Sequence, residues 1–172
     1  MDCGLVKEAI CLWSLDRVGK YSMAVRVLNE QLSLHLMSTN RSSTSSTPGD
    51  TVNSEIGAFA QERKDLITLA GDFFSRSQNS EVMKRGLSRA TAKIDLDALC
   101  IFISLYQYVD LCGKPSTYDK ALLKIQSDPL RTFIPSRNRD LEDAVNRFSR
   151  ASQFLKHKMP QLLLMHMKCL RW

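Results

Sequence analysis

The sequence has little of what a metal site needs. Only three histidines occur, His35, His157 and His166, and none belongs to a His-Glu-x-x-His segment. Zinc sites usually combine two or more histidine, cysteine or acidic ligands at short, regular spacing, and no such group is found along this chain. We therefore predict no metal and no other cofactor.

Paired cysteines are also missing. The five cysteines are scattered and odd in number, and no two of them form a C-x-x-C pair: Cys3, Cys11, Cys100, Cys112 and Cys169. This pattern predicts neither a disulfide framework nor a zinc module. We expect reduced thiols, with Cys100 and Cys112 serving as small core residues of one apolar helix.

The motifs of phosphate-binding loops and nucleophile elbows do not occur in the sequence. Two carboxylates, Asp95 and Asp97, lie close together, but at positions i and i+2 of a helix they point in different directions. We expect them to stabilise the first turn of that helix through its dipole. The protein is predicted not to be an enzyme and to have no small-molecule substrate.

Targeting and membrane-spanning segments are not recognisable. The N-terminus has no basic region ahead of a long apolar run and no arginine-rich presequence. Every apolar segment is too short to cross a bilayer. We expect a cytosolic or nuclear protein that is not transmembrane.

The net charge of +6 is unevenly distributed. Residues 1–128 carry fifteen basic and fifteen acidic side chains, whereas 129–172 carry nine basic and three acidic ones. A basic C-terminal region suits an acidic partner, a phosphate backbone or a membrane surface, but also an ordinary solvated helix face. A second basic group is predicted on one side of a helix: Lys84, Arg85, Arg89 and Lys93. Because no aromatic residues interleave with it, we do not expect direct nucleic-acid binding.

Helix-length apolar segments, separated by short breaks, run through the whole chain. The densest, Ile94–Cys112, has no charged residue between Asp97 and Asp110, which predicts a helix buried among other helices. Leu5–Leu15 and Tyr21–Met37 predict a helix hairpin with Gly19 at its turn. The predicted fold is all-α: about eight helices in stacked antiparallel hairpins, forming a single α-solenoid over residues 1–172.

The remaining helices and breaks follow from spacing and capping residues. Pro129–Pro135 and Pro160 interrupt the helical period, and Ser116–Asp119 has the spacing of a capping box. The other predicted helices are Ile56–Phe74, Asn79 or Ser80 to Lys93, one beginning at Ser116–Asp119, Asn138 or Asp140 to Leu155, and Leu162–Trp172.

Residues 38–54 form a polar segment in which ten of seventeen residues are Ser or Thr. Such a segment buries too little apolar area to offset an ordering entropy of about 1–2 kcal/mol per residue, so we predict a disordered loop. Within it, Thr47-Pro48 fits the short motif of a proline-directed kinase. Thr47 is thus a candidate phosphorylation site, and an unmodified linker threonine is the alternative.

The order of the segments resembles a known family. The segments that carry the resemblance are Gly4–Ala9, Arg26–Leu32, the Ser/Thr-rich linker, Leu66–Ala70, Leu96–Tyr108, Tyr118–Ala121 and Leu130–Pro135. Together they are similar to the C-terminal part of the nucleoporin-interacting component family, the large scaffold nucleoporins of the nuclear pore's inner ring. The resemblance spans nearly the whole chain, which would correspond to about a quarter of a member and stop before the last helices of the family.

The resemblance implies a structural constituent of the nuclear pore complex at the nuclear envelope. Implied partners are other inner-ring nucleoporins and linker nucleoporins, and implied roles are pore assembly and nucleocytoplasmic transport of protein and mRNA. The channel-recruiting region of the family is N-terminal and is not expected here. The sequence alone does not identify the partner-binding residues.

Two other hypotheses stay open. A tetratricopeptide-like adaptor would place Tyr21, Asn29 and basic side chains around one concavity, whereas a scaffold would expose apolar patches at helix ends. Nucleic-acid binding through the basic C-terminal helices would depend steeply on salt.

Overall fold

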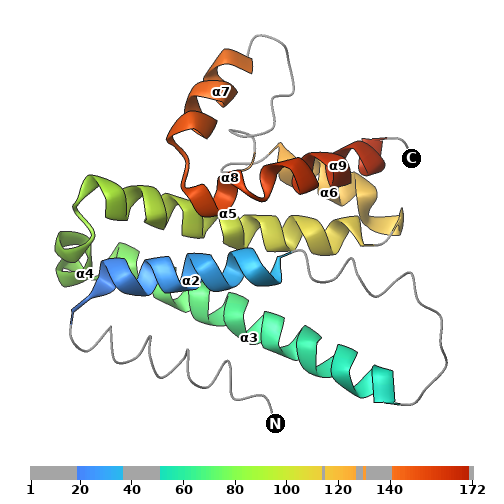
Figure 1. The fold of residues 1–172 in the computed structure, drawn as a ribbon, viewed down its shortest axis with the longest axis horizontal. Helices are drawn as coiled ribbons and strands as arrows, with labels where there is room; N and C mark the ends of the chain where they lie inside the picture. The colour runs from blue at the N-terminus through green and yellow to red at the C-terminus, as the bar shows by residue number, and fades with distance from the viewer. Residues whose placement is uncertain (1–18, 37–50, 114, 127–129, 131–140, 171–172) are drawn as a thin grey trace. The chain divides into compact units, whose positions relative to one another are not determined.

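The computed structural model describes residues 19–36, 51–113, 115–126, 130 and 141–170. In these ranges the regular elements are eight α-helices and short 3-10 turns, without a strand, which confirms the all-α prediction (Figure 1). Contacts within the chain define two compact units, residues 1–89 and 90–172. Each unit is described separately, and the single α-solenoid over 1–172 stays a prediction.

The first unit contains α2 (Tyr21–His35), α3 (Thr51–Asn79) and α4 (Glu81–Gly86). Gly19 precedes α2 with φ of 72°, in the left-handed region that glycine adopts without strain. The predicted turn at Gly19 is therefore confirmed. The helix expected at Leu5–Leu15 lies outside the described residues.

α2 and α3 pack against each other through apolar residues at helical spacing. On α2 the fully buried apolar residues are Ala24, Val25, Leu28 and Leu32. On α3 they are Leu66, Ala70 and Phe73, one to two turns apart. The small side chains of Ala24 and Ala70 permit this packing.

α3 is longer than the sequence predicted at both ends. It begins at Thr51, so the expected loop over 38–54 is wrong for its last four residues, and the rest of that loop lies outside the described residues. At the other end the polar segment after Phe74 remains helical. Its side chains bond to carbonyls one turn back: Ser77 Oγ donates to Phe74 O at 2.6 Å and Asn79 Nδ2 to Ser75 O at 3.0 Å.

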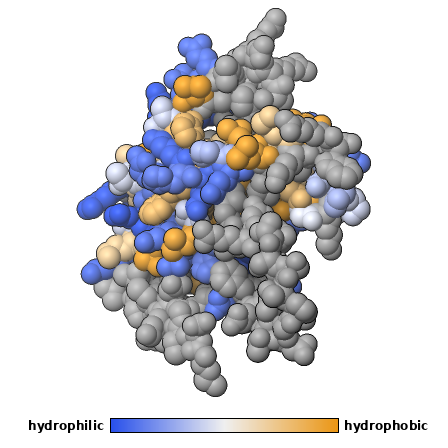
Figure 2. Space-filling view, turned by 45° about the vertical axis from the view of Figure 1, so that its right-hand side comes forward, coloured by the Kyte–Doolittle hydropathy of each residue, from blue (hydrophilic) through white to orange (hydrophobic). Residues whose placement is uncertain are grey.

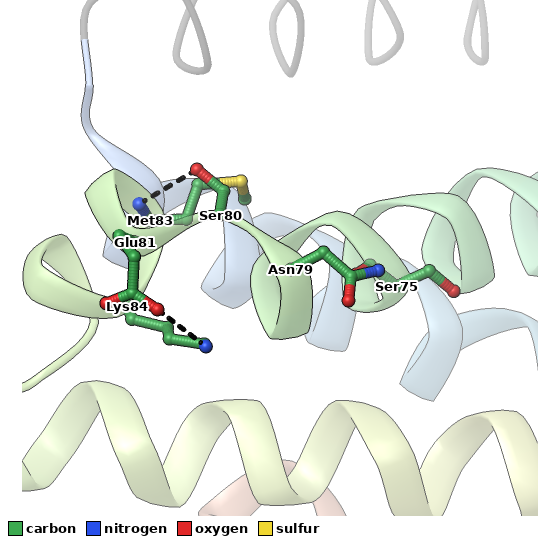
Figure 3. Close-up of polar contacts among 6 residues, drawn as sticks. All are labelled: Ser75, Asn79, Ser80, Glu81, Met83 and Lys84. Atoms are coloured by element: carbon green, nitrogen blue, oxygen red, sulfur yellow. Dashed lines mark hydrogen bonds and ion pairs between the residues drawn. The ribbon is translucent and has the colours of Figure 1, made fainter.

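Ser80 separates α3 from α4, as Figure 3 shows. Its Oγ accepts a hydrogen bond from Met83 N at 3.4 Å, which makes Ser80 the N-cap of α4 and confirms one of the two caps predicted. The predicted continuation of this helix to Lys93 is wrong, because α4 ends at Gly86. Leu87 then turns inward, where it is buried.

The second unit is built around α5 (Ala90–Cys112). α5 contacts α6 (Tyr118–Ile125), α8 (Gln153–Lys156) and α9 (Met159–Leu170), as Figure 1 shows. Its buried side chains surround most of the helix and include Leu99, Phe102, Leu105, Tyr106 and Tyr108. The predicted burial of this apolar segment is confirmed. Among the described residues, no helix is both long and apolar enough to span a bilayer.

The connection from α5 to α6 differs from the predicted capping box. A 3-10 turn, η2 (Pro115–Thr117), follows α5, and Thr117 is the N-cap of α6. Its side chain makes no cap bond to α6, and Thr117 Oγ1 donates to Leu111 O at 2.6 Å, near the end of α5. The capping box at Ser116–Asp119 is therefore wrong.

The helix expected to run to Leu155 is interrupted. α7 (Leu141–Arg150) ends before a bend at Ala151 and Ser152, and α8 follows. Lys156 Nζ donates to Ser149 O at 2.8 Å, so a side chain of α8 satisfies a carbonyl at the end of α7. Pro160 is the second residue of α9, where its missing N–H is not required, which confirms the predicted restart at this proline.

Candidate partner-binding surfaces

The three histidines do not converge. His35 ends α2 in the first unit, while His157 follows α8 and His166 lies in α9. Within the described ranges, no group of three or more His, Cys, Asp or Glu residues has the arrangement of a metal site.

His166 instead joins two helices. Its Nδ1 lies 3.2 Å from the hydroxyl of Tyr108, which is completely buried on α5. The two ring centroids are 6.4 Å apart. Burial lowers the pKa of His166, so the neutral ring is favoured next to the tyrosine. This contact attaches α9 to α5 and has a structural role.

Asp95 and Asp97 are not in the first turn of their helix, because α5 begins at Ala90. The predicted capping role is wrong for this reason. Desolvation raises the pKa of Asp97, and the neighbouring Lys93 partly opposes the rise. Burial, and to a smaller extent Asp97, raises the pKa of the Cys100 thiol, against a smaller effect of Lys124. A raised thiol pKa disfavours the reactive thiolate.

Cys100 and Cys112 are free thiols and are half-buried rather than fully enclosed. Their position on α5 agrees with the sequence analysis. Cys3 and Cys11 lie outside the described residues, as does Thr47, and the side chain of Cys169 is not described. The prediction of phosphorylation at Thr47 is thus untested.

The basic side that the sequence predicted on one helix does not form. Lys84 and Arg85 belong to α4, Arg89 lies in the break that follows, and Lys93 belongs to α5. Lys84 is also paired with Glu81 at 2.9 Å, as Figure 3 shows. These four residues do not belong to one helix, and the prediction is wrong because the helix ends at Gly86.

The concavity required by the adaptor hypothesis is not supported at Asn29. This side chain is completely buried in α2 and therefore cannot meet a peptide at a surface. Tyr21 is half-buried beside Gly86: a methyl group added at Gly86 would lie 2.6 Å from the tyrosine ring. Both residues serve the packing of the first unit.

Large apolar side chains are nevertheless exposed in both units. Figure 2 shows them as several small groups among hydrophilic residues. Met23 and Leu34 are single exposed residues toward the two ends of α2. α7 exposes Val145 and Phe148. Among the side chains that the structure describes, the largest set on one helix belongs to α9: Leu163, Leu164, Met167 and Leu170.

The described part of the chain belongs to the class of all-α proteins built from packed helices. The comparison with family models identifies the family within this class. The model described as Nup93/Nic96 matches residues 1–171, and the chain belongs to this family. Its members are scaffold nucleoporins of the nuclear pore complex, so the resemblance noted in the sequence is confirmed. No curated protein and no solved structure matches the chain.

Sequence analysis predicted a helix over Leu162–Trp172 but did not identify which of its apolar side chains are exposed. Apolar residues occur on all sides of Leu162–Leu170, so the sequence does not distinguish the packed side from the exposed side. The usable signal is the spacing of Leu163, Met167 and Leu170, at positions i, i+4 and i+7.

Proposed function

We propose that this chain acts as a structural segment of a nuclear pore scaffold and binds other nucleoporins of the inner ring and linker nucleoporins. In this role it supports pore assembly and, through it, the nucleocytoplasmic transport of protein and mRNA. The observation that carries the proposal is the match to the Nup93/Nic96 family over residues 1–171. The expected location is the nuclear envelope.

Surface complementarity between helices is the proposed mechanism. α5 and its neighbours provide a buried core, with Phe102 and Tyr106 completely enclosed, and this core holds the outer helices in place. Exposed aliphatic side chains then offer apolar area that a partner can remove from water, at about 25 cal/mol per Å². A solenoid of stacked helix hairpins over the whole chain would present such surfaces along its length.

A pull-down from nuclear-envelope extract tests this function. The full chain serves as bait at low and moderate salt, after nuclease treatment, and the captured proteins are identified by mass spectrometry. Recovery of inner-ring nucleoporins at both salt concentrations supports a scaffold role, because apolar contacts depend little on salt. Recovery of only nucleic-acid-binding proteins, lost as salt rises, would instead support binding through the basic C-terminal region.

Thr47 is proposed as a regulatory site in the same scaffold. A phosphate there would add about two negative charges to a polar segment that sequence analysis predicts to be disordered. Phosphopeptide mapping of the protein isolated from cells decides whether the site is used.

A further inference from the structure

One side of α9 is packed, and the apolar side chains beside and beyond that side are open to solvent. Met159 and Leu162 are buried, at 8% and 0% exposure, where α9 contacts α5 and α6. Leu163, Leu164, Met167 and Leu170 are 43%, 62%, 49% and 60% exposed. We refer to these four residues as the α9 outer face. Burying them completely would remove substantial further apolar area from water.

The spacing of the α9 outer face matches a helix–helix contact. Leu163, Met167 and Leu170 lie at i, i+4 and i+7, so they form a stripe along one side of the helix. With a rise of about 1.5 Å per residue, this stripe is roughly 10 Å long. A second helix lying alongside α9 can cover such a stripe with its own apolar residues.

The charge of the C-terminal stretch that contains α9 selects the partner. No acidic residue follows Asp143, and residues 144–172 contain six basic side chains, whereas residues 1–143 contain eighteen of each sign. The entire formal net charge of +6 thus lies in this C-terminal stretch. Two copies of it would repel each other, while a partner with acidic residues beside its apolar stripe would be attracted.

We propose that the α9 outer face docks an amphipathic helix of a partner protein whose apolar stripe is flanked by Asp and Glu. This inference deepens the scaffold function proposed above and rests on it, since it assigns a surface and a chemistry to one of the partners. Charge then determines which helices bind, and the four aliphatic side chains provide the contact area.

A membrane surface fits the same face less well. Helices that lie in a bilayer interface bury one apolar side in lipid, expose a polar side to water and commonly carry Trp or Phe. α9 instead has apolar residues on two sides, one of which is already covered by α5 and α6. The α9 outer face is aliphatic throughout. Its geometry therefore favours a protein helix.

Synthetic peptides test this proposal on the full chain. Two fluorescent amphipathic peptides share one leucine stripe and differ only in whether Glu or Lys flanks it. We expect the Glu peptide to bind and the Lys peptide to bind at least about tenfold more weakly, as measured by anisotropy at moderate salt. The double substitution Leu164→Gln and Met167→Gln should weaken binding of the Glu peptide about tenfold or more.

The first unit offers a closely matched control. Leu34 and Met23 on α2 are 61% and 51% exposed, compared with 62% and 49% for Leu164 and Met167. The double substitution Leu34→Gln and Met23→Gln should leave peptide binding within about twofold of the unsubstituted chain. Because all four positions are well exposed, we expect both variants to fold, and circular dichroism is the measurement that checks this.

Several results would overturn the proposal. Equal binding of the Glu and Lys peptides would show that charge does not select the partner. Equal binding of the Glu peptide by the two double variants would show that the α9 outer face is not the binding surface. Binding to vesicles of phosphatidylcholine and phosphatidylserine, without binding to the Glu peptide, would assign the face to a membrane. A dimer that only the α9 variant disrupts would assign it to a second copy. If the pull-down succeeds while the peptide assay fails, only this surface assignment is rejected.

Discussion

α5 and α9 are both apolar helices of the second unit, yet they have different environments. α5 is enclosed around most of its circumference, with Leu99, Phe102 and Tyr106 buried. α9 buries Leu162 on one side and exposes Leu164 on the other. Apolar composition predicts that a helix needs neighbours, but it does not say how many of those neighbours the chain itself supplies. The uncovered side of α9 is therefore informative about partners.

The largest expected effect contrasts the interior of α5 with the α9 outer face. Phe102→Ala should lower the free energy of unfolding by about 3–5 kcal/mol, because it leaves a cavity in the core. Leu164→Ala should change it by no more than about 0.5 kcal/mol, because most of that side chain is already in water. Urea denaturation measures both values. Similar losses for the two variants would mean that α9 is as enclosed as α5.

Two glycines of the first unit allow the same comparison between a packed position and an open position. A methyl group at Gly86 would lie 2.6 Å from the ring of Tyr21, so Gly86→Ala should destabilise the protein by about 1–3 kcal/mol. Gly71, inside α3, has nothing within 4 Å of the added methyl, so Gly71→Ala should stabilise by about 0.4–1 kcal/mol. Thermal unfolding compares them. Stabilisation by both substitutions would show that Tyr21 moves aside freely.

The contact that attaches α9 to α5 should make stability depend on pH. Burial lowers the pKa of His166 below its usual value of 6.5, so the unfolded chain binds more protons than the folded chain just below that pH. The contribution of His166 is fully present above pH 6.5 and is lost as the pH falls toward the lower, folded-state pKa. Urea midpoints between pH 7.5 and pH 5 measure this loss.

His166→Gln is the control for this pH dependence, since it removes the titrating group from α9. The pH dependence of stability is measured for both proteins. The difference between them is the contribution of His166. An identical pH dependence in both proteins would contradict a buried, neutral histidine beside Tyr108.

The smallest expected effect concerns the hydroxyl of Tyr108. Tyr108→Phe removes the partner 3.2 Å from His166 Nδ1 but keeps the buried ring, so the loss of stability should be about 1 kcal/mol. Calorimetry of the two proteins at pH 7.5 measures it. A loss as large as that expected for Phe102→Ala would mean that the hydroxyl organises more of the core than this one contact.

The general fold was predictable from the sequence because its signals are local. The uncharged stretch between Asp97 and Asp110 predicts the buried α5, and Gly19 predicts the turn before α2. Pro160 predicts the restart of a helix because it lacks an N–H. In each case one property of the residues themselves determines the local structure.

The incorrect predictions depend on contacts that the local sequence does not show. The Thr117 side chain makes no cap bond to α6, and its hydroxyl donates to the carbonyl of Leu111 in the preceding helix. The predicted helix to Lys93 ends at Gly86, where Tyr21 lies close and Leu87 turns into the core. Asp95 misses the first turn of its helix because α5 begins a full turn earlier, at Ala90.

The candidate site was the least predictable part for the same reason. Leu162 and Leu163 are neighbours of the same residue type, and only the packing of α9 on α5 and α6 makes one buried and the other exposed. The basic character of the C-terminal region was evident from the sequence. Its combination with an exposed aliphatic stripe was not.

One measurement tests most directly whether α9 is the surface by which this scaffold segment meets a partner. Both double variants, Leu164→Gln with Met167→Gln and Leu34→Gln with Met23→Gln, are used as bait in nuclear-envelope extract, and captured nucleoporins are quantified by mass spectrometry. We expect the α9 variant to lose at least one inner-ring or linker nucleoporin that the α2 variant and the unsubstituted chain retain. Identical sets of captured nucleoporins for all three baits would contradict this account.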